Sequence, residues 1–75
     1  DDLAPYFRML YRLIRFIDRA NISSEKKVEF AEIVRAELSP SELRLLALNC
    51  LTGHGKKFKD LVVRYHLLKH LPEDD

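Results

Sequence analysis

The stretch RYHLLKH, residues 64–70, holds the densest group of side chains that could do chemistry. Arg64 and His70 are separated by five residues. A histidine can act as a general acid or base near neutral pH, and a guanidinium can stabilise a pentavalent phosphate, so this pair suits cleavage of RNA. His66 and His70 lie four residues apart, the spacing of two zinc ligands on a helix. The plainer interpretation is a solvated helix face.

Other reactive patterns in the chain are weaker. A zinc site needs a third ligand, and His54 reaches the other two histidines only if its loop folds back. The segment GHGKK lacks the spacing of a phosphate-binding loop and has no strand before it. Cys50 is the single cysteine and lies in an apolar run, which predicts a small buried side chain with little thiolate character. We therefore predict no metal and no cofactor.

The largest coherent polar feature is a row of arginines near the start of the chain. Their spacing of four, three and four residues places them on one helical face: Arg8, Arg12, Arg15 and Arg19. Such a face can bind an anion, whether RNA, DNA, a lipid headgroup or an acidic protein surface. The alternative is that the arginines only form a solvated face, or pair with glutamates of other helices, namely Glu25, Glu29, Glu32, Glu37 or Glu42. The net charge of +1 favours that alternative.

Composition predicts one all-α domain over residues 1–75. Two glycines and three prolines are too few for a turn-rich β fold, and 47% apolar residues suit a folded domain. We expect a compact bundle of four helices, over residues 3–19, over 25–37, from 40 and from 56, with a short fifth helix near the C-terminus as an alternative. No apolar run approaches the roughly 18–20 residues that span a bilayer.

Apolar periodicity predicts which faces are buried. The first helix carries two neighbouring stripes, one of Leu3, Phe7, Leu10, Ile14 and Ile17, the other of Tyr6, Met9, Leu13 and Phe16. We expect this helix to bury most of itself or to face a partner as well. A dimer would then use Leu3, Phe7, Leu10 or Ile14. On the second helix we expect one face of Val28, Ala31, Val34 and Leu38, flanked by Phe30 and Ile33.

Local signals set the ends of the later helices. Ser39, Pro40 and Glu42 have the spacing of a capping box with proline at the first helical position. The helix that follows is expected to be largely buried, with Leu45 and Leu48 broadening its apolar stripe. Gly53 is the expected cap at its end. The last helix is expected to bend or end near Tyr65.

Three segments together resemble a known family. They are YFRMLYRLIRFID (residues 6–18), IVRAELSPSELRLLALNCL (33–51) and GKKFKDLVVRYHLLKHL (55–71). In this order they resemble the phage abortive infection family of the AbiC type. The resemblance implies a bacterial antiviral role for a helical domain on the cytoplasmic side of a membrane anchor, and it supplies no catalytic residues. Because the chain begins at Asp1 without a methionine, we expect a fragment of a longer protein.

Three functional hypotheses follow. The leading one is a helical phage-defence domain that acts through protein–protein contacts, either with another protein or with its own copies. The second is an RNase: antiphage RNases of the HEPN type carry an arginine, four to six residues and a histidine, and Arg64 and His70 match that spacing. The third is binding of nucleic acid or another anion by the arginine row. Membrane contact is expected only through segments outside this chain.

Overall fold

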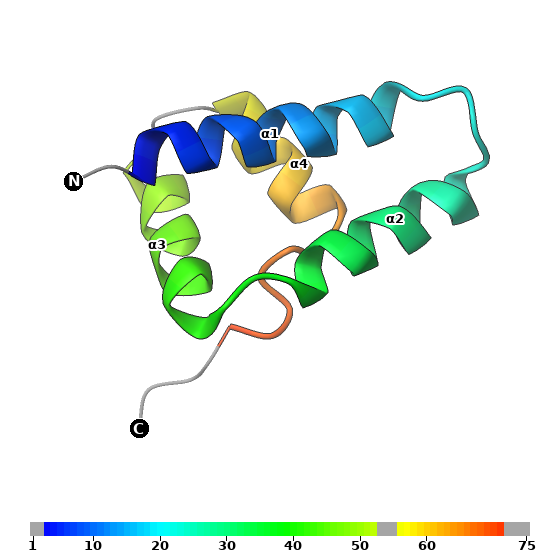
Figure 1. Ribbon diagram of the computed structural model, residues 1–75. Coiled ribbons are helices and arrows are strands. Elements are labelled where there is room, and N and C mark those ends of the chain that lie inside the picture. Colours follow the sequence, from blue (N-terminus) through cyan, green and yellow to red (C-terminus); the bar gives the residue numbers. More distant parts are fainter. Residues whose placement is uncertain (1–2, 53–55, 72–75) are drawn as a thin grey trace.

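The computed structural model describes residues 3–52 and 56–71, and four α-helices account for the regular structure of these residues. They are α1 (Leu3–Arg19), α2 (Ser24–Ala36), α3 (Pro40–Leu51) and α4 (Lys56–Arg64). Figure 1 shows α2 running back below α1, α3 closing the end near the start of α1, and α4 lying behind them. The predicted all-α fold is confirmed. Residues 65–70 form turns in place of a fifth helix.

Serine caps start α2 and α3. The Ser23 hydroxyl accepts a hydrogen bond from the Lys26 amide at 3.2 Å. The Ser39 hydroxyl accepts from the Glu42 amide at 3.1 Å, and the Ser39 amide donates to Glu42 Oε1 at 2.8 Å. The predicted capping box is therefore confirmed, and Pro40 occupies the first turn as expected. Gly53, the expected cap at the other end of α3, lies outside the described residues.

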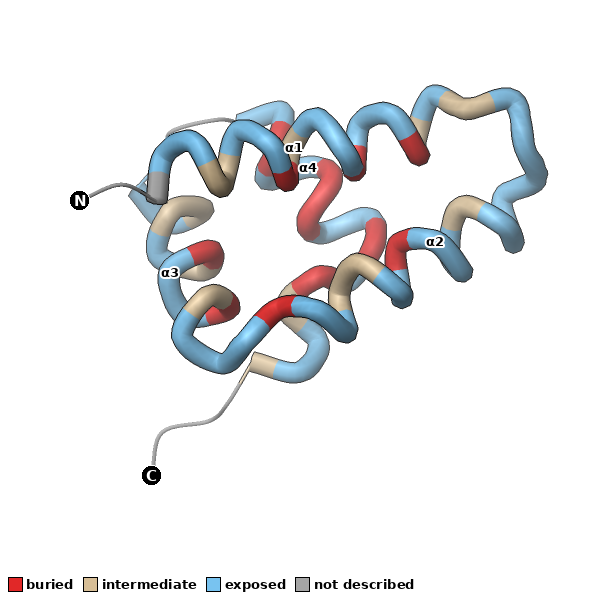
Figure 2. The backbone as a smooth tube through the Cα atoms, viewed as in Figure 1, coloured by how far each residue is buried: buried red, intermediate tan, exposed pale blue. Residues whose placement is uncertain are grey.

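A small core joins all four helices and the turns that follow α4. Figure 2 shows the buried positions facing inward on each element. Three of the core side chains, Ile14, Leu46 and Leu67, are completely shielded from solvent. The buried set is Leu10, Ile14, Ile17, Ala31, Leu38, Leu43, Leu46, Phe58, Leu61, Val62, Tyr65 and Leu67.

Burial is narrower than the apolar patterns predicted. The second stripe of α1 faces solvent, with Met9 60%, Leu13 43% and Phe16 73% exposed. On α3, Leu45 and Leu48 are also exposed, so the prediction of a largely buried α3 was wrong. On α2, Val28 is exposed along with the flanking Phe30 and Ile33. The reason is size, because four short helices around a small core each bury one side.

The expected dimer contact needs correction. Leu10 and Ile14 are 4% and 0% exposed within a single chain, so neither is available to a second copy. Phe7 is half-buried. The Leu3 side chain is not among the side chains that the structure describes. In this fold, the apolar surface that α1 offers to a partner is therefore Met9, Leu13 and Phe16, which we call the outer stripe.

The capping box of α3 yields a stability prediction. S39A removes the side-chain acceptor for the Glu42 amide and should lower the free energy of unfolding by about 1 kcal/mol. Urea unfolding followed by circular dichroism would measure it. S41A is the matched control, because Ser41 is exposed in the same first turn and makes no cap contact. An equal loss in both variants would contradict a capping role for Ser39.

Candidate functional site

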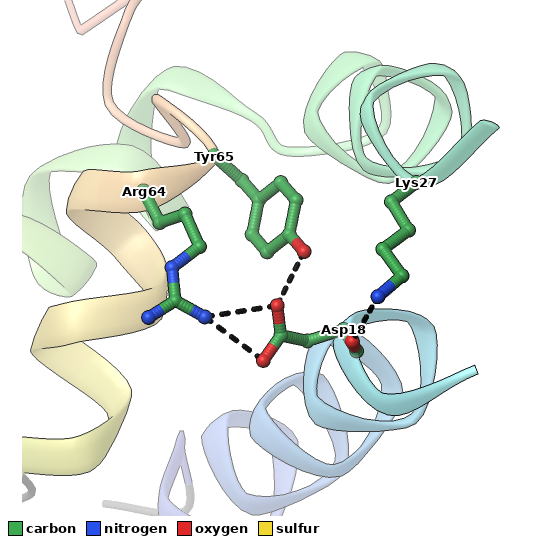
Figure 3. Close-up of polar contacts among 4 residues, drawn as sticks. All are labelled: Asp18, Lys27, Arg64 and Tyr65. Atoms are coloured by element: carbon green, nitrogen blue, oxygen red, sulfur yellow. Dashed lines mark hydrogen bonds and ion pairs between the residues drawn. The ribbon is translucent and has the colours of Figure 1, made fainter. Parts of the chain in front are cut away.

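Asp18, near the end of α1, is the centre of a polar cluster that joins distant parts of the chain (Figure 3). Its two carboxylate oxygens accept hydrogen bonds from Arg64 Nη1 at 2.9 and 3.0 Å. Its Oδ1 also accepts a short hydrogen bond from the Tyr65 hydroxyl. Lys27 Nζ, on α2, donates to the Asp18 backbone carbonyl at 2.7 Å. We call these four residues the Asp18 cluster.

Each ionisable group of the cluster responds to its neighbours. The hydrogen bond from Tyr65 lowers the pKa of Asp18, and the Arg64 and Lys27 cations lower it further, against an opposing effect of burial. Asp18 in turn raises the pKa of Arg64. Burial, with the Asp18 contact, raises the pKa of Tyr65 to about 12. At neutral pH the cluster is therefore an ionised carboxylate held by a guanidinium and a neutral phenol.

The segment after Arg64 leaves the helix through a left-handed residue. His66 has φ of 54°, and the amides of His66 and Leu67 donate to the carbonyls of Val63 at 3.3 Å and Val62 at 3.0 Å. These two bonds define a Schellman motif, in which the residue after the cap is usually glycine. The buried Leu67 and Val62 supply its accompanying apolar pair. Of the two outcomes expected near Tyr65, a bend or an end, the structure shows the end, because α4 stops at Arg64.

This geometry separates the two RNase candidates along the chain. Arg64 closes α4, whereas His70 follows in the turns and is exposed. Across residues 3–52 and 56–71, no hydrogen bond or ion pair joins them, and Arg64 is engaged by Asp18 instead. Any phosphate approaching Arg64 competes with that carboxylate. An RNase role for Arg64 and His70 stays a prediction.

The histidine pair is arranged differently from a helical zinc pair. His66 takes the left-handed conformation, so the chain between His66 and His70 is not helical. His54 lies outside the described residues. Among the residues that the structure describes, no three histidine, cysteine, aspartate or glutamate side chains gather where they could hold a metal ion.

A shallow groove runs beside the Schellman motif. Its volume is about 340 Å³, and α2, the end of α4 and the turns supply its walls, with Val28, Glu32, Arg35, Arg64, Tyr65, His66 and Lys69. Arg35 donates to the His66 carbonyl at 3.3 Å and lies 3.8 Å from Glu32. Arg35 therefore braces the turn against α2, and two of the groove's cations are already paired.

The arginine face of α1, defined as Arg8, Arg12, Arg15 and Arg19, is exposed along its whole length. Three of the five glutamates that could pair with it have other contacts: Glu29 pairs with Lys26, Glu32 with Arg35, and Glu42 caps α3. Within the described parts of the chain, no ion pair involves these four arginines. Three of them line a groove of about 590 Å³ together with Phe16, Ala20 and Asn21.

The outer stripe of Met9, Leu13 and Phe16 lies next to the arginine face. Its three side chains are spaced four and three residues apart, so they follow one another along consecutive turns of α1. Phe16 belongs to both surfaces, because its ring shares the groove with Arg12, Arg15 and Arg19. The two surfaces together make an exposed strip that is apolar along one edge and basic along the other.

An aromatic groove of about 450 Å³ lies at the other end of α1. Phe7, Tyr11 and Phe58 form its apolar wall, and Arg8, Lys56 and Lys57 also line it. Tyr11 and Phe58 pack edge to face with ring centres 5.4 Å apart.

Cys50, on α3, is half-buried, and burial raises the pKa of its thiol, which disfavours the nucleophilic thiolate.

Asp18 was not among the candidate site residues inferred from the sequence. One signal pointed to it. Asp18 comes one turn after Ile14 and so shares the buried side of α1. A carboxylate on a buried face needs a partner. The identity of the partners could not be inferred, because Arg64 and Tyr65 are 46 and 47 residues away.

A family model described as putative phage abortive infection protein matches residues 1–75. No curated protein and no solved structure matches the chain. Of the helices in residues 3–52 and 56–71, none combines the length and apolar character needed to cross a membrane.

The Asp18 cluster yields a pH prediction. Because the pKa of Asp18 is lowered on folding, its contribution to stability is complete above the unfolded value of about 3.9 and disappears as pH falls through the folded value. D18N should therefore be less stable than wild type at pH 7, and the difference should shrink as pH falls below about 4.

Thermal unfolding across this pH range would measure the D18N difference. D60N is the matched control, because it removes an exposed carboxylate from α4 without breaking the cluster. A D18N difference that stays constant from pH 7 to about pH 2 would contradict the ionised contact.

The left-handed residue yields a second prediction. H66G should be at least as stable as wild type, because relief of about 1 kcal/mol of backbone strain offsets the added entropy of the unfolded chain. H66V should lose about 1–2 kcal/mol, since a β-branched residue tolerates this conformation poorly. Urea midpoints measure both. Equal stability of the two variants would mean that His66 is not held left-handed.

Proposed function

Because the chain belongs to the family of putative phage abortive infection proteins, we propose that it serves phage defence as a helical domain acting through protein–protein contacts. Family membership supports the defence role. We assign the protein–protein contacts to the outer stripe of α1.

The observation that carries the proposal is the exposure of the outer stripe. Met9, Leu13 and Phe16 remain 60%, 43% and 73% accessible in a chain that completes its core without them. Full burial of an apolar side chain of this size stabilises a complex by about 1.5–3 kcal/mol. The gain is smaller for these three side chains, because each is already partly buried in the free protein. Three such side chains on consecutive turns can therefore supply several kcal/mol of binding free energy to a partner.

Binding of an anion by the arginine face is a second candidate. It is favoured by the absence of ion pairs on that face within the described residues and by the groove that Arg12, Arg15 and Arg19 share. Phosphate binding of this kind is salt-dependent and insensitive to sequence. It would make the arginines, rather than the outer stripe, the determinant of function.

A plating assay tests the proposal in bacteria that express the protein and are protected by it. A double variant, L13E/F16E, places charge in the contact surface and should remove protection, since loss of about 1.4 kcal/mol already weakens a complex tenfold. V63E is the matched control, because Val63 is 64% exposed on α4 and lies outside the outer stripe. Circular dichroism of purified variants checks the fold.

Two further variants separate the alternatives in the same assay. H70A should leave protection unchanged, and R8E/R12E should affect it less than L13E/F16E does. If H70A abolished protection while L13E/F16E retained it, the proposal would be wrong and the RNase hypothesis supported. If R8E/R12E alone removed protection together with salt-sensitive RNA binding, anion binding would replace it.

A further inference from the structure

The outer stripe has the spacing of a coiled-coil seam. Tyr6, Met9, Leu13 and Phe16 follow one another at intervals of three, four and three residues. This is the alternation of a and d positions in a heptad repeat, with Tyr6 and Leu13 at a and Met9 and Phe16 at d. Tyr6 is half-buried and the other three are exposed. The surface is therefore shaped for one more helix lying along α1.

The two edges of this seam differ. On one edge, the heptad places Arg12 and Arg19 at g positions, where side chains reach towards the flank of a docked helix. The matching e positions on the other edge are Leu10 and Ile17, which are 4% and 7% exposed in the protein's own core. A docked helix therefore meets a basic edge on one side and the protein itself on the other.

The basic edge has no internal counter-charge on its own helix. Asp18 is the single acidic residue of α1, and it is directed to Arg64 and Tyr65 on the inner side (Figure 3). Arg8 and Arg15 lie at c positions behind the edge and add to its positive potential. Charge complementarity thus calls for a partner with carboxylates along one side.

We propose that the outer stripe docks one amphipathic α-helix of a partner protein, with apolar residues on Met9, Leu13 and Phe16 and Asp or Glu facing Arg12 and Arg19. The inference rests on the proposed function and names the chemistry of its partner. Apolar burial supplies affinity, and the acidic flank selects orientation and register.

A second copy of α1 fits this surface poorly. In an antiparallel pair of α1 helices, the g edges face each other, which places Arg12 and Arg19 against the same arginines of the other copy. In a parallel pair, the g edge meets the e edge, which is occupied by the core around Leu10 and Ile17. The seam is therefore suited to a helix of opposite charge.

Nucleic acid uses only part of the same surface. Phosphates would neutralise the arginines, and a base could stack on Phe16. Met9 and Leu13 would stay uncovered, because they belong to the outer stripe and not to the arginine face. A helix covers the outer stripe and the edge of Arg12 and Arg19 at once, which is why the observations favour it.

A pair of synthetic peptides tests the proposal on the purified chain. Both are about three heptads long with leucine at a and d; one carries Glu at the e and g positions and the other Lys. Like charges keep each peptide monomeric. By fluorescence anisotropy, the Glu peptide should bind at least about tenfold more tightly than the Lys peptide, because flanking pairs attract in one case and repel in the other.

Variants locate the contact. R12E/R19E should reverse the preference between the two peptides, whereas R8E/R15E, the matched control at c positions, should reduce it without reversing it. F16A should weaken both peptides, and its fold is checked by unchanged thermal unfolding because Phe16 is 73% exposed. V63A should change neither.

Several outcomes would overturn the proposal. One is equal binding of both peptides. Another is concentration-dependent dimers in sedimentation that F16A abolishes. A third is binding of single-stranded RNA or of phosphatidylglycerol vesicles that is tighter than binding of the Glu peptide and that R12E/R19E removes. The two proposals fail separately. Loss of phage protection in L13E/F16E without charge discrimination between peptides leaves protein contact standing and rejects the acidic helix. If the chain distinguishes the two peptides but L13E/F16E keeps phage protection, the acidic helix stands and the assignment of the defence role to the outer stripe is rejected.

Discussion

The packing of the ends of α1 and α4 depends on the contact between Asp18 and the Arg64–Tyr65 pair. This contact ties the end of α1 to the end of α4, while Lys27 ties α2 to the same residue. The Asp18 side chain is 22% exposed and the Arg64 side chain 58%, so water screens their ion pair, and the hydrogen bond from the buried Tyr65 is the better shielded contact. The ring of Tyr65 lies in the core, and its hydroxyl donates a hydrogen bond to Asp18 at the edge of the core.

The small size of the core explains the outer surface. Packing one side of each helix uses the apolar residues that face inward, and the remaining ones are left on the outside of α1, α2 and α3. On α1 these residues follow a regular row beside four arginines, whereas α2 and α3 each carry a single arginine beside their exposed apolar residues. That difference in organisation distinguishes a surface fit for a partner from scattered exposure, which is common in soluble proteins.

Local sequence patterns predicted the helices, whereas packing decided the faces. Ser39 and Glu42 are three residues apart, so their capping box depends only on neighbours and could be inferred. Leu10 and Leu13 are both apolar and lie on adjacent stripes. Leu10 is 4% exposed and Leu13 43% exposed, and this difference depends on where α2, α3 and α4 lie. The same holds for Arg64, which looked available beside His70. Its engagement by Asp18 spans 46 residues and leaves no local trace.

Leu67 carries a consequence for synthesis. Its side chain is 0% exposed, and it reaches the core only because the chain reverses at His66. On a ribosome, α1, α2 and α3 emerge before Leu67, so the core cluster stays incomplete until the turn after α4 has been synthesised. Folding of the complete core therefore has to wait for the last part of the described chain.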